Sequence, residues 1–258
     1  MATEVDLAAR FHENNTLAGR RVEAISPGGG HVIEGPWDLV DSGTPGFPGA
    51  NTASVIDHAE VTDLDAALAW FRGRGIEGAA GRFLLRADRD AHLVAELARR
   101  GAPPLFTEPV LELPPDRPLP PAIDGPLAIR EVTAEADLER YGPVNWPPEQ
   151  HYIGQGIARQ ARDLGFTMLL GTLEGAPIAC SMVVVTGELA AAYNVGVEPP
   201  YRRRGFGEAM TWAAFRAGRD RGARHFWLGA SDMGYPLYLK MGFVPRFEYR
   251  AIGLPPEA

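Results

Sequence analysis

The apolar and polar positions of this chain predict an alternation of strands and helices. From Phe206 onwards apolar residues recur at intervals of three and four, which is the spacing of one face of an amphipathic helix. The preceding residues, 189–197, read as an apolar strand. The junction at 199–207 contains two prolines, three arginines and two glycines. The pattern therefore predicts that a strand passes into a helix through an arginine–glycine loop.

This loop has the features of an anion-binding site. The first turn of a helix carries N–H groups without intrahelical partners, together with the positive end of the helix dipole. Gly205 and Gly207 allow a ligand to approach the backbone closely, and Arg202, Arg203 and Arg204 add positive charge. A phosphate or a pyrophosphate is the expected occupant.

The second half of the chain has a definite order of elements. A strand at 127–132 precedes two helices, which are separated by the prolines at 143–148. Three apolar segments between 166 and 197, joined by turns at Glu174-Gly175 and Gly187-Glu188, predict successive antiparallel strands. The elements expected after the arginine–glycine loop are a helix, a buried strand at 225–230, a short helix at 236–241 and a terminal strand at 243–252.

The first half, residues 1–112, reads as mixed helix and strand without a phosphate loop, a metal-ligand spacing or a nucleophile motif. Its expected helices lie at 5–17, 62–73 and 91–101, and its expected strands at 31–43, 50–58, 82–87 and 109–113. Six prolines in 113–126 predict an extended, stiff connector between two domains, 1–112 and 127–258. A long surface loop inside one domain is the alternative.

Composition excludes some classes of partner. A net charge of −8 over 258 residues argues against a general nucleic-acid or membrane-surface binder. The first 15 residues do not resemble a secretory signal, and no apolar run approaches the ~20 residues of a membrane helix. We therefore expect a cytoplasmic protein. Cys180, the single cysteine, lies among apolar residues, which favours core packing over a nucleophilic role.

Two motifs make residues 127–252 resemble the GNAT superfamily of acyl-CoA-dependent N-acyltransferases. Val197-Glu198-Pro199 followed by Arg202-Arg203-Arg204-Gly205-Phe206-Gly207 resembles the family's acyl-CoA signature. Tyr238, four residues before Gly242-Phe243, resembles the second motif, and residues 229–234 look like the link before it. The resemblance implies an α/β (α+β) GNAT fold, with a mixed, mostly antiparallel sheet flanked by helices.

More faintly, residues 1–112 resemble the degenerate N-terminal half of two-module GNAT proteins. The resemblance then implies two tandem GNAT-like modules, of which only the second has a cofactor site. The first module would pack on the catalytic half and shape the substrate cleft.

The resemblance also implies the ligand: acetyl-CoA or another acyl-CoA, with no metal. Main-chain groups of Val195 and Val197 would pair with pantetheine, and a nearby N–H would polarise the thioester carbonyl. Gly196 between them suggests a β-bulge. Ser231 would contact pantetheine or cap the next helix. The expected cofactor-binding residues are Val195, Val197, Arg202, Arg203, Arg204, Gly205, Phe206, Gly207 and Ser231.

Tyr238 is the candidate general acid, because a phenol is protonated at neutral pH and can give its proton to a departing thiolate. The alternative is an aromatic core residue. The base is open: the leading hypothesis is water held by backbone carbonyls, and the side-chain candidates are Glu149, His151 and Asp232. Glu198, beside the loop, is expected to be solvated.

The expected acceptor is a small-molecule amine, bound by a monomer or a homodimer. The residues expected to line its pocket are Trp146, Glu149, His151, Tyr152, Tyr193, Asn194 and Tyr235. Two alternatives stay open. One is acetylation of a protein N-terminus or lysine, and the other is a non-catalytic acyl-CoA-binding protein.

Overall fold

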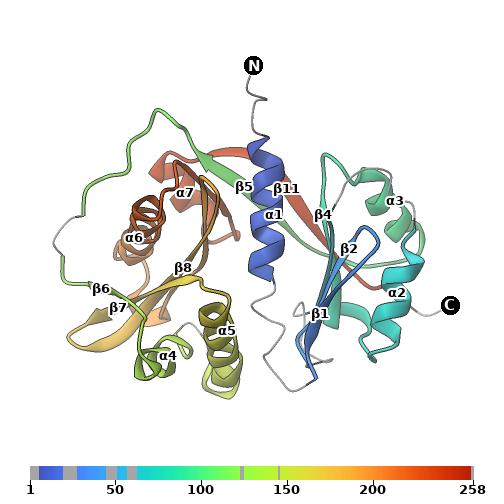
Figure 1. The fold of residues 1–258 in the computed structure, drawn as a ribbon, viewed down its shortest axis with the longest axis horizontal. Helices are drawn as coiled ribbons and strands as arrows, with labels where there is room; N and C mark the ends of the chain where they lie inside the picture. Colours follow the sequence, from blue (N-terminus) through green and yellow to red (C-terminus); the bar gives the residue numbers. More distant parts are fainter. Residues whose placement is uncertain are drawn as a thin grey trace. The chain divides into compact units, whose positions relative to one another are not determined.

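The computed structural model describes residues 6–19, 28–44, 51–56, 63–122, 125–144 and 146–256. These residues form two compact units (Figure 1). Unit 1 contains the described residues of 6–19 and 111–244, and unit 2 contains those of 28–110 and 245–256.

Unit 1 is built on a mostly antiparallel sheet. Strands β6 (Ala128–Glu131), β7 (Thr167–Leu173), β8 (Ala176–Thr186) and β9 (Leu189–Val197) pair antiparallel in chain order, and β10 (His225–Gly229) pairs parallel with β9. The predicted Glu174-Gly175 turn joins β7 to β8 with φ values of 50° and 83°. Two successive left-handed residues are what a tight hairpin turn with the strand twist requires.

Helix α6 (Phe206–Asp220) covers one face of this sheet. Its buried Met210 and Phe215 pack against Ala190 and Ala192 of β9 and against Phe226 and Leu228 of β10. Gly218 brings the helix close to the sheet, because a Cβ there would lie 2.7 Å from the Cβ of Ala190.

Unit 1 also contains α1, α4, α5 and α7. Helices α4 (Glu135–Tyr141) and α5 (His151–Asp163) pack on β7, and α7 (Tyr235–Met241) follows β10. Helix α1 (Leu7–Gly19) begins after Asp6, whose Oδ1 accepts the N–H groups of Ala8 and Ala9 at 3.1 and 3.0 Å.

Unit 2 contains neighbouring strands in the order β1-β2-β3-β4-β11-β5. Its core contains the edge-to-face rings of Trp37, Phe71 and Phe83, 5.5 to 5.9 Å apart. The strands are β1 (Gly30–Glu34), β2 (Trp37–Asp41), β3 (Asn51–Val55), β4 (Gly81–Arg86), β5 (Pro104–Leu113) and β11 (Val244–Gly253), and the helices are α2 (Asp65–Arg72) and α3 (Ala91–Arg99).

The units differ from the predicted domains 1–112 and 127–258 at both ends of the chain. The first helix belongs to unit 1, because its buried side chains pack on β8, β9 and β10. The last strand belongs to unit 2, where β11 pairs antiparallel with β4 in the register Tyr249↔Arg86. Strand pairing between distant segments follows from complementary edges and faces, which local sequence patterns do not specify.

The proline-rich segment also differs from its prediction as a connector between domains. The chain passes from unit 2 into unit 1 within β5, between Val110 and Leu111, before the prolines begin. The described residues of the segment belong to unit 1, where Leu119 packs against the core and Arg216 Nη1 donates to Pro120 O at 3.4 Å. The alternative of a surface loop inside one domain therefore describes this segment.

Within the ranges given above, none of the helices combines the length and the apolar composition needed to cross a bilayer.

Candidate active site

The arginine–glycine loop adopts a backbone that exposes N–H groups at the start of α6. Gly205, the residue before the helix, has φ of 82°, and Arg203 has φ of 62°. Gly205 has no side chain to cap the helix, and the first helical bond runs from Ala209 N–H to Gly205 O at 3.0 Å. The N–H groups of residues 206–208 therefore precede the hydrogen-bonded ladder and can point at an anion.

The three arginines of the loop have different environments. Arg202 is half-buried, and its Nε donates to Val197 O at 2.9 Å. Arg203 and Arg204 are exposed, and the Arg204 guanidinium lies 5.3 Å from the ring of Phe206. Within the described part of the chain, no carboxylate forms an ion pair with Arg203 or Arg204, so their charge is available to a ligand. Arg202 instead anchors the loop to the end of β9.

Strands β9 and β10 separate on the approach to this loop. Their parallel register ends at Ala192↔Leu228, whereas β9 continues to pair with β8 as far as Ala179↔Val197. The edge of β9 that faced β10 is thus left without its neighbour over residues 193–197. Glu198 N–H donates to Ile178 O at 2.8 Å, and main-chain groups alternate between the two edges of a strand. The N–H of Val197 therefore faces the opening.

A β-bulge lies in the same stretch, two residues before the predicted position at Gly196. The pairing of β8 with β9 shifts between Cys180 and Met182, so that Asn194 and Val195 together oppose Ser181. Asn194 has φ of 49°, a left-handed conformation that asparagine tolerates better than most residues. The bulge changes the direction of β9 at the point where it leaves β10.

Cys180 packs beside this bulge as a core residue. It is 4% exposed, and its Sγ donates to Asn194 O at 3.3 Å. Burial raises the pKa of the thiol to about 12, which keeps it protonated at neutral pH. This agrees with the predicted packing role.

Tyr238 lies on α7 with its ring in the core of unit 1, 7% exposed and 6.1 Å from the Phe243 ring. Its hydroxyl is hydrogen-bonded to the side chain of Thr211, whose Oγ1 donates to Gly207 O at 2.8 Å. Because Thr211 has a single hydroxyl hydrogen, it accepts from Tyr238. Burial raises the pKa of the phenol to about 12.

The geometry thus gives Tyr238 properties of both predicted roles, the general acid and the aromatic core residue. The ring packs as a core residue, while the phenol stays protonated and close to the helix that carries the loop. Thr211 was not identified from sequence, although a hydroxyl residue on the buried stripe of α6 is a recognisable signal.

The Gly242-Phe243 pair has a structural role that explains its distance from Tyr238. Gly242 has φ of 90° and ends α7, where Phe243 N–H donates to Tyr238 O at 3.0 Å. The Phe243 ring, 2% exposed, lies 5.9 Å from Trp212 and 5.6 Å from Phe215. The pair therefore anchors α7 against α6 and holds Tyr238 in place.

Ser231 stabilises the turn that leads into α7. Its Oγ accepts the N–H of Gly234 at 3.2 Å, and its main-chain oxygen accepts the N–H of Tyr235 at 2.9 Å. The residue before α7 is Gly234, and no side chain caps the helix there, so Ser231 stabilises the preceding turn and does not make the predicted helix cap. Its side chain is exposed, so a contact with pantetheine stays a prediction.

The predicted acceptor residues lie in different parts of unit 1. Tyr235 packs, as Val195 and Val197 do, against the core cluster that contains Phe206 and Tyr238. A second group surrounds the start of α5, where His151 Nε2 lies 3.2 Å from Trp146 O and where Glu149 and Tyr152 are exposed. The half-buried Asn194 lies on the bulge of β9, the strand between β8 and β10.

Tyr193 differs from its predicted role as an acceptor contact. It is 9% exposed, and its hydroxyl donates to Asn14 Oδ1 of α1 at 2.8 Å. The sequence could not reveal this pairing, because the two residues are 179 positions apart.

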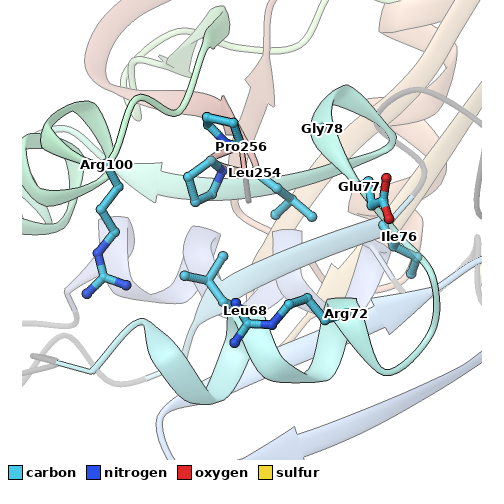
Figure 2. Close-up of a pocket in the computed structure, with 9 residues that line it drawn as sticks. Leu68, Arg72, Ile76, Glu77, Gly78, Arg100, Leu254 and Pro256 are labelled. Carbon is cyan, nitrogen blue, oxygen red and sulfur yellow. The ribbon is translucent and has the colours of Figure 1, made fainter. Parts of the chain in front are cut away.

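Unit 2 contains a pocket of about 670 Å³ that involves none of these residues (Figure 2). Its lining is Leu68, Arg72, Ile76, Glu77, Gly78, Arg100, Leu254, Pro255 and Pro256. Arg100 is already paired with Asp65 and Glu96. The pocket has no counterpart of the arginine–glycine loop. Among the residues that the structure describes, no group of three or more His, Cys, Asp or Glu side chains could hold a metal ion.

Comparison with known proteins shows what this site is similar to. Residues 132–236 match the family model described as an acetyltransferase (GNAT) domain. Over these residues the chain is similar to a GNAT acetyltransferase domain. This domain is characteristic of acyl-CoA-dependent acetyltransferases, and the match ends inside α7, two residues before Tyr238. No curated protein matches the sequence at a significant level.

Solved structures show that the GNAT fold accounts for both units. A GCN5-related N-acetyltransferase from Kribbella flavida covers 98% of each chain, with a TM-score of 0.64 and 18% identity. A tandem GNAT protein from the clavulanic acid biosynthesis pathway covers 98% of this chain and 96% of its own, with a TM-score of 0.62 and 13% identity. At these identities the likeness shows the fold, which agrees with the predicted tandem GNAT architecture.

Proposed function

We propose that unit 1 transfers an acetyl group from acetyl-CoA to the amine of a small molecule, by direct attack of the amine on the thioester. The observation that carries the proposal is the separation of β9 from β10 after Ala192↔Leu228, which leads straight into the left-handed turn at Arg203 and Gly205. The separated strands offer main-chain groups to the extended pantetheine arm of acetyl-CoA, and the turn offers N–H groups to the pyrophosphate.

Each part of the loop has a distinct task in this proposal. The N–H groups of residues 206–208 bind the pyrophosphate, with charge from Arg203 and Arg204. Arg202 keeps the carbonyl of Val197 occupied, so that the N–H of Val197 is the group left for pantetheine. A main-chain N–H of the bulge, at Val195, stabilises the negative charge that develops on the thioester oxygen.

Proton transfers complete the reaction. The amine nitrogen forms a bond to the thioester carbon, the carbon–sulfur bond breaks, and the thiolate takes the proton of the Tyr238 hydroxyl. This requires the O–H of Tyr238 to rotate away from Thr211. The amine loses its proton to water held by backbone carbonyls, and Tyr238 regains a proton from solvent.

The amine stays open within this proposal, because Trp146 and Tyr235 define aromatic surfaces but not a charge preference. A small molecule is favoured over a peptide because aromatic surfaces with few polar groups suit a compact ligand. Glu149 is exposed and His151 is half-exposed near the start of α5, where they could contact polar groups of the acceptor.

Two measurements test the proposal. Calorimetry should show acetyl-CoA binding that is lost on the double substitution of Arg203 and Arg204 by Glu, which replaces two exposed cations by anions. Thiol release should then appear with members of a small-amine panel and not with peptides bearing free N-termini or lysines. Peptide turnover would favour protein acetylation, and binding without thiol release from any acceptor would favour a non-catalytic acyl-CoA-binding protein.

A further inference from the structure

Helix α1 lies across the point where β9 and β10 separate. Along each strand, alternate side chains point to opposite faces. Ala192 and Leu228, the last residues in register, pack toward α6. Their neighbours Tyr193 and Trp227 therefore point to the other face, and α1 contacts both of them.

The contact with β10 is a buried aromatic pair. Phe11 of α1 is fully buried, and its ring stacks on Trp227 with centroids 5.7 Å apart and an interplanar angle of 28°. Trp227 is itself 2% exposed. Stacked pairs of this kind contribute beyond the area that they bury, and they fix the relative position of the two elements.

The contact with β9 and β8 is made by Asn14, which is fully buried. Its Nδ2 donates to Val184 O at 3.0 Å and to Thr186 Oγ1 at 2.8 Å. Its Oδ1 accepts the hydroxyl of Tyr193 at 2.8 Å. Both amide hydrogens and the carbonyl oxygen are therefore used, and the acceptor Val184 O fixes the orientation of the amide.

We propose that α1 is a clamp that holds β9 and β10 at the separation an acyl-CoA arm requires, with Asn14 and Phe11 as positioning residues. Beyond Ala192 the parallel ladder no longer holds the strands together, so side-chain contacts fix the gap between them. The helix contacts one strand through Tyr193 and the other through Trp227, at the vertex of the opening. We call the opening between β9 and β10 after Ala192↔Leu228 the slot. A slot that is fixed before the ligand arrives binds it without the entropic cost of ordering two strand ends.

The clamp rests on the proposed acyl-CoA function, and binding measurements on one helix test it. Asn14→Ala should raise the acetyl-CoA Kd about tenfold, and Thr186→Val, which removes a single hydrogen bond, about threefold. Glu13→Ala is the matched control, because the Glu13 side chain, next to Asn14 in sequence, is 64% exposed. Ile157→Val controls for stability, since it trims the buried face of α5 and leaves the strands intact.

A purely structural role for Asn14 would lower the melting temperature and leave the Kd of the folded protein unchanged. An Asn14→Ala protein with a Kd within twofold of the wild type would overturn the clamp. If Asn14→Ala does not fold, Thr186→Val decides the matter by the same criterion.

Failure of the proposed function is distinguishable from failure of the clamp. If the wild-type protein does not bind acetyl-CoA, the function is wrong, and amide hydrogen exchange of the ligand-free protein then decides the clamp. Faster exchange of residues 193–197 and 226–229 in Asn14→Ala, by tenfold or more relative to α5, supports it. Equal exchange in these strands overturns it.

Discussion

Replacement of Tyr238 by Phe separates the catalytic role of this residue from its packing role. The change keeps the buried ring and removes one hydroxyl, which is hydrogen-bonded to Thr211. The lost hydrogen bond should cost about 1 kcal/mol of unfolding free energy. Loss of a general acid should lower kcat at least about 100-fold, which is about 2.7 kcal/mol of transition-state stabilisation. The effect on activity should therefore exceed the effect on stability.

Thr211→Val is the matched control for this prediction. It removes the hydroxyl partner and leaves the phenol of Tyr238 buried without that hydrogen bond, which should cost about 1–3 kcal/mol, at least as much as Tyr238→Phe. It does not remove the phenolic proton, so kcat should stay within about fivefold of the wild type. The two variants should thus rank in opposite order for stability and for turnover.

The raised pKa of Tyr238 adds a pH dependence with a definite sign. The phenol is protonated in both states below pH 10, and above it the unfolded chain loses this proton first, because burial raises the folded-state pKa to about 12. Stability is therefore lost as the pH rises from about 10 through about 12, by roughly 3 kcal/mol for a shift of this size. Tyr238→Phe should lack this component.

The assays are thiol release at saturating acetyl-CoA, and urea unfolding at pH 8 and pH 11. The catalytic assignment is refuted if Tyr238→Phe keeps more than about a third of the wild-type kcat. Equal losses of kcat in Tyr238→Phe and Thr211→Val would equally refute it, because both would then act through the packing of α7.

Three further substitutions test the site and its support. Gly205→Ala should weaken acetyl-CoA binding about five- to tenfold, because a left-handed alanine costs roughly 1–2 kcal/mol. Gly165→Ala is the control: Gly165, at the end of α5, has φ of 75°, and its replacement should leave the calorimetric Kd unchanged. Cys180 should resist alkylation by iodoacetamide at pH 8 until urea unfolds the protein, because burial raises its thiol pKa to about 12; rapid labelling of the folded protein would contradict this. Gly154→Ala should lower the melting temperature strongly, by several degrees in calorimetry, because its Cβ would lie 1.8 Å from Gly142 O; a normal melting temperature would show that α4 and α5 can move apart.

The loop, its helix and the hairpin before it could be predicted from sequence because their determinants are local. A left-handed residue before α6 needs a glycine such as Gly205, and the Glu174-Gly175 turn has its own conformational signature. The Gly242-Phe243 pair is equally local, since it ends α7 one turn after Tyr238. Spacing along the chain was therefore enough to place the candidate anion site and the candidate acid.

The tertiary structure alone decided which segments complete each unit and what the side chains near the slot contact. Helix α1 packs against β9 and β10, and β11 pairs with β4, although each is far from its partners in the sequence. Tyr193 has a side chain of the kind that lines ligand pockets, yet its hydroxyl donates a hydrogen bond to Asn14. Such contacts depend on which faces and edges remain uncovered once the sheets have formed, and a residue's neighbours in sequence do not carry that information.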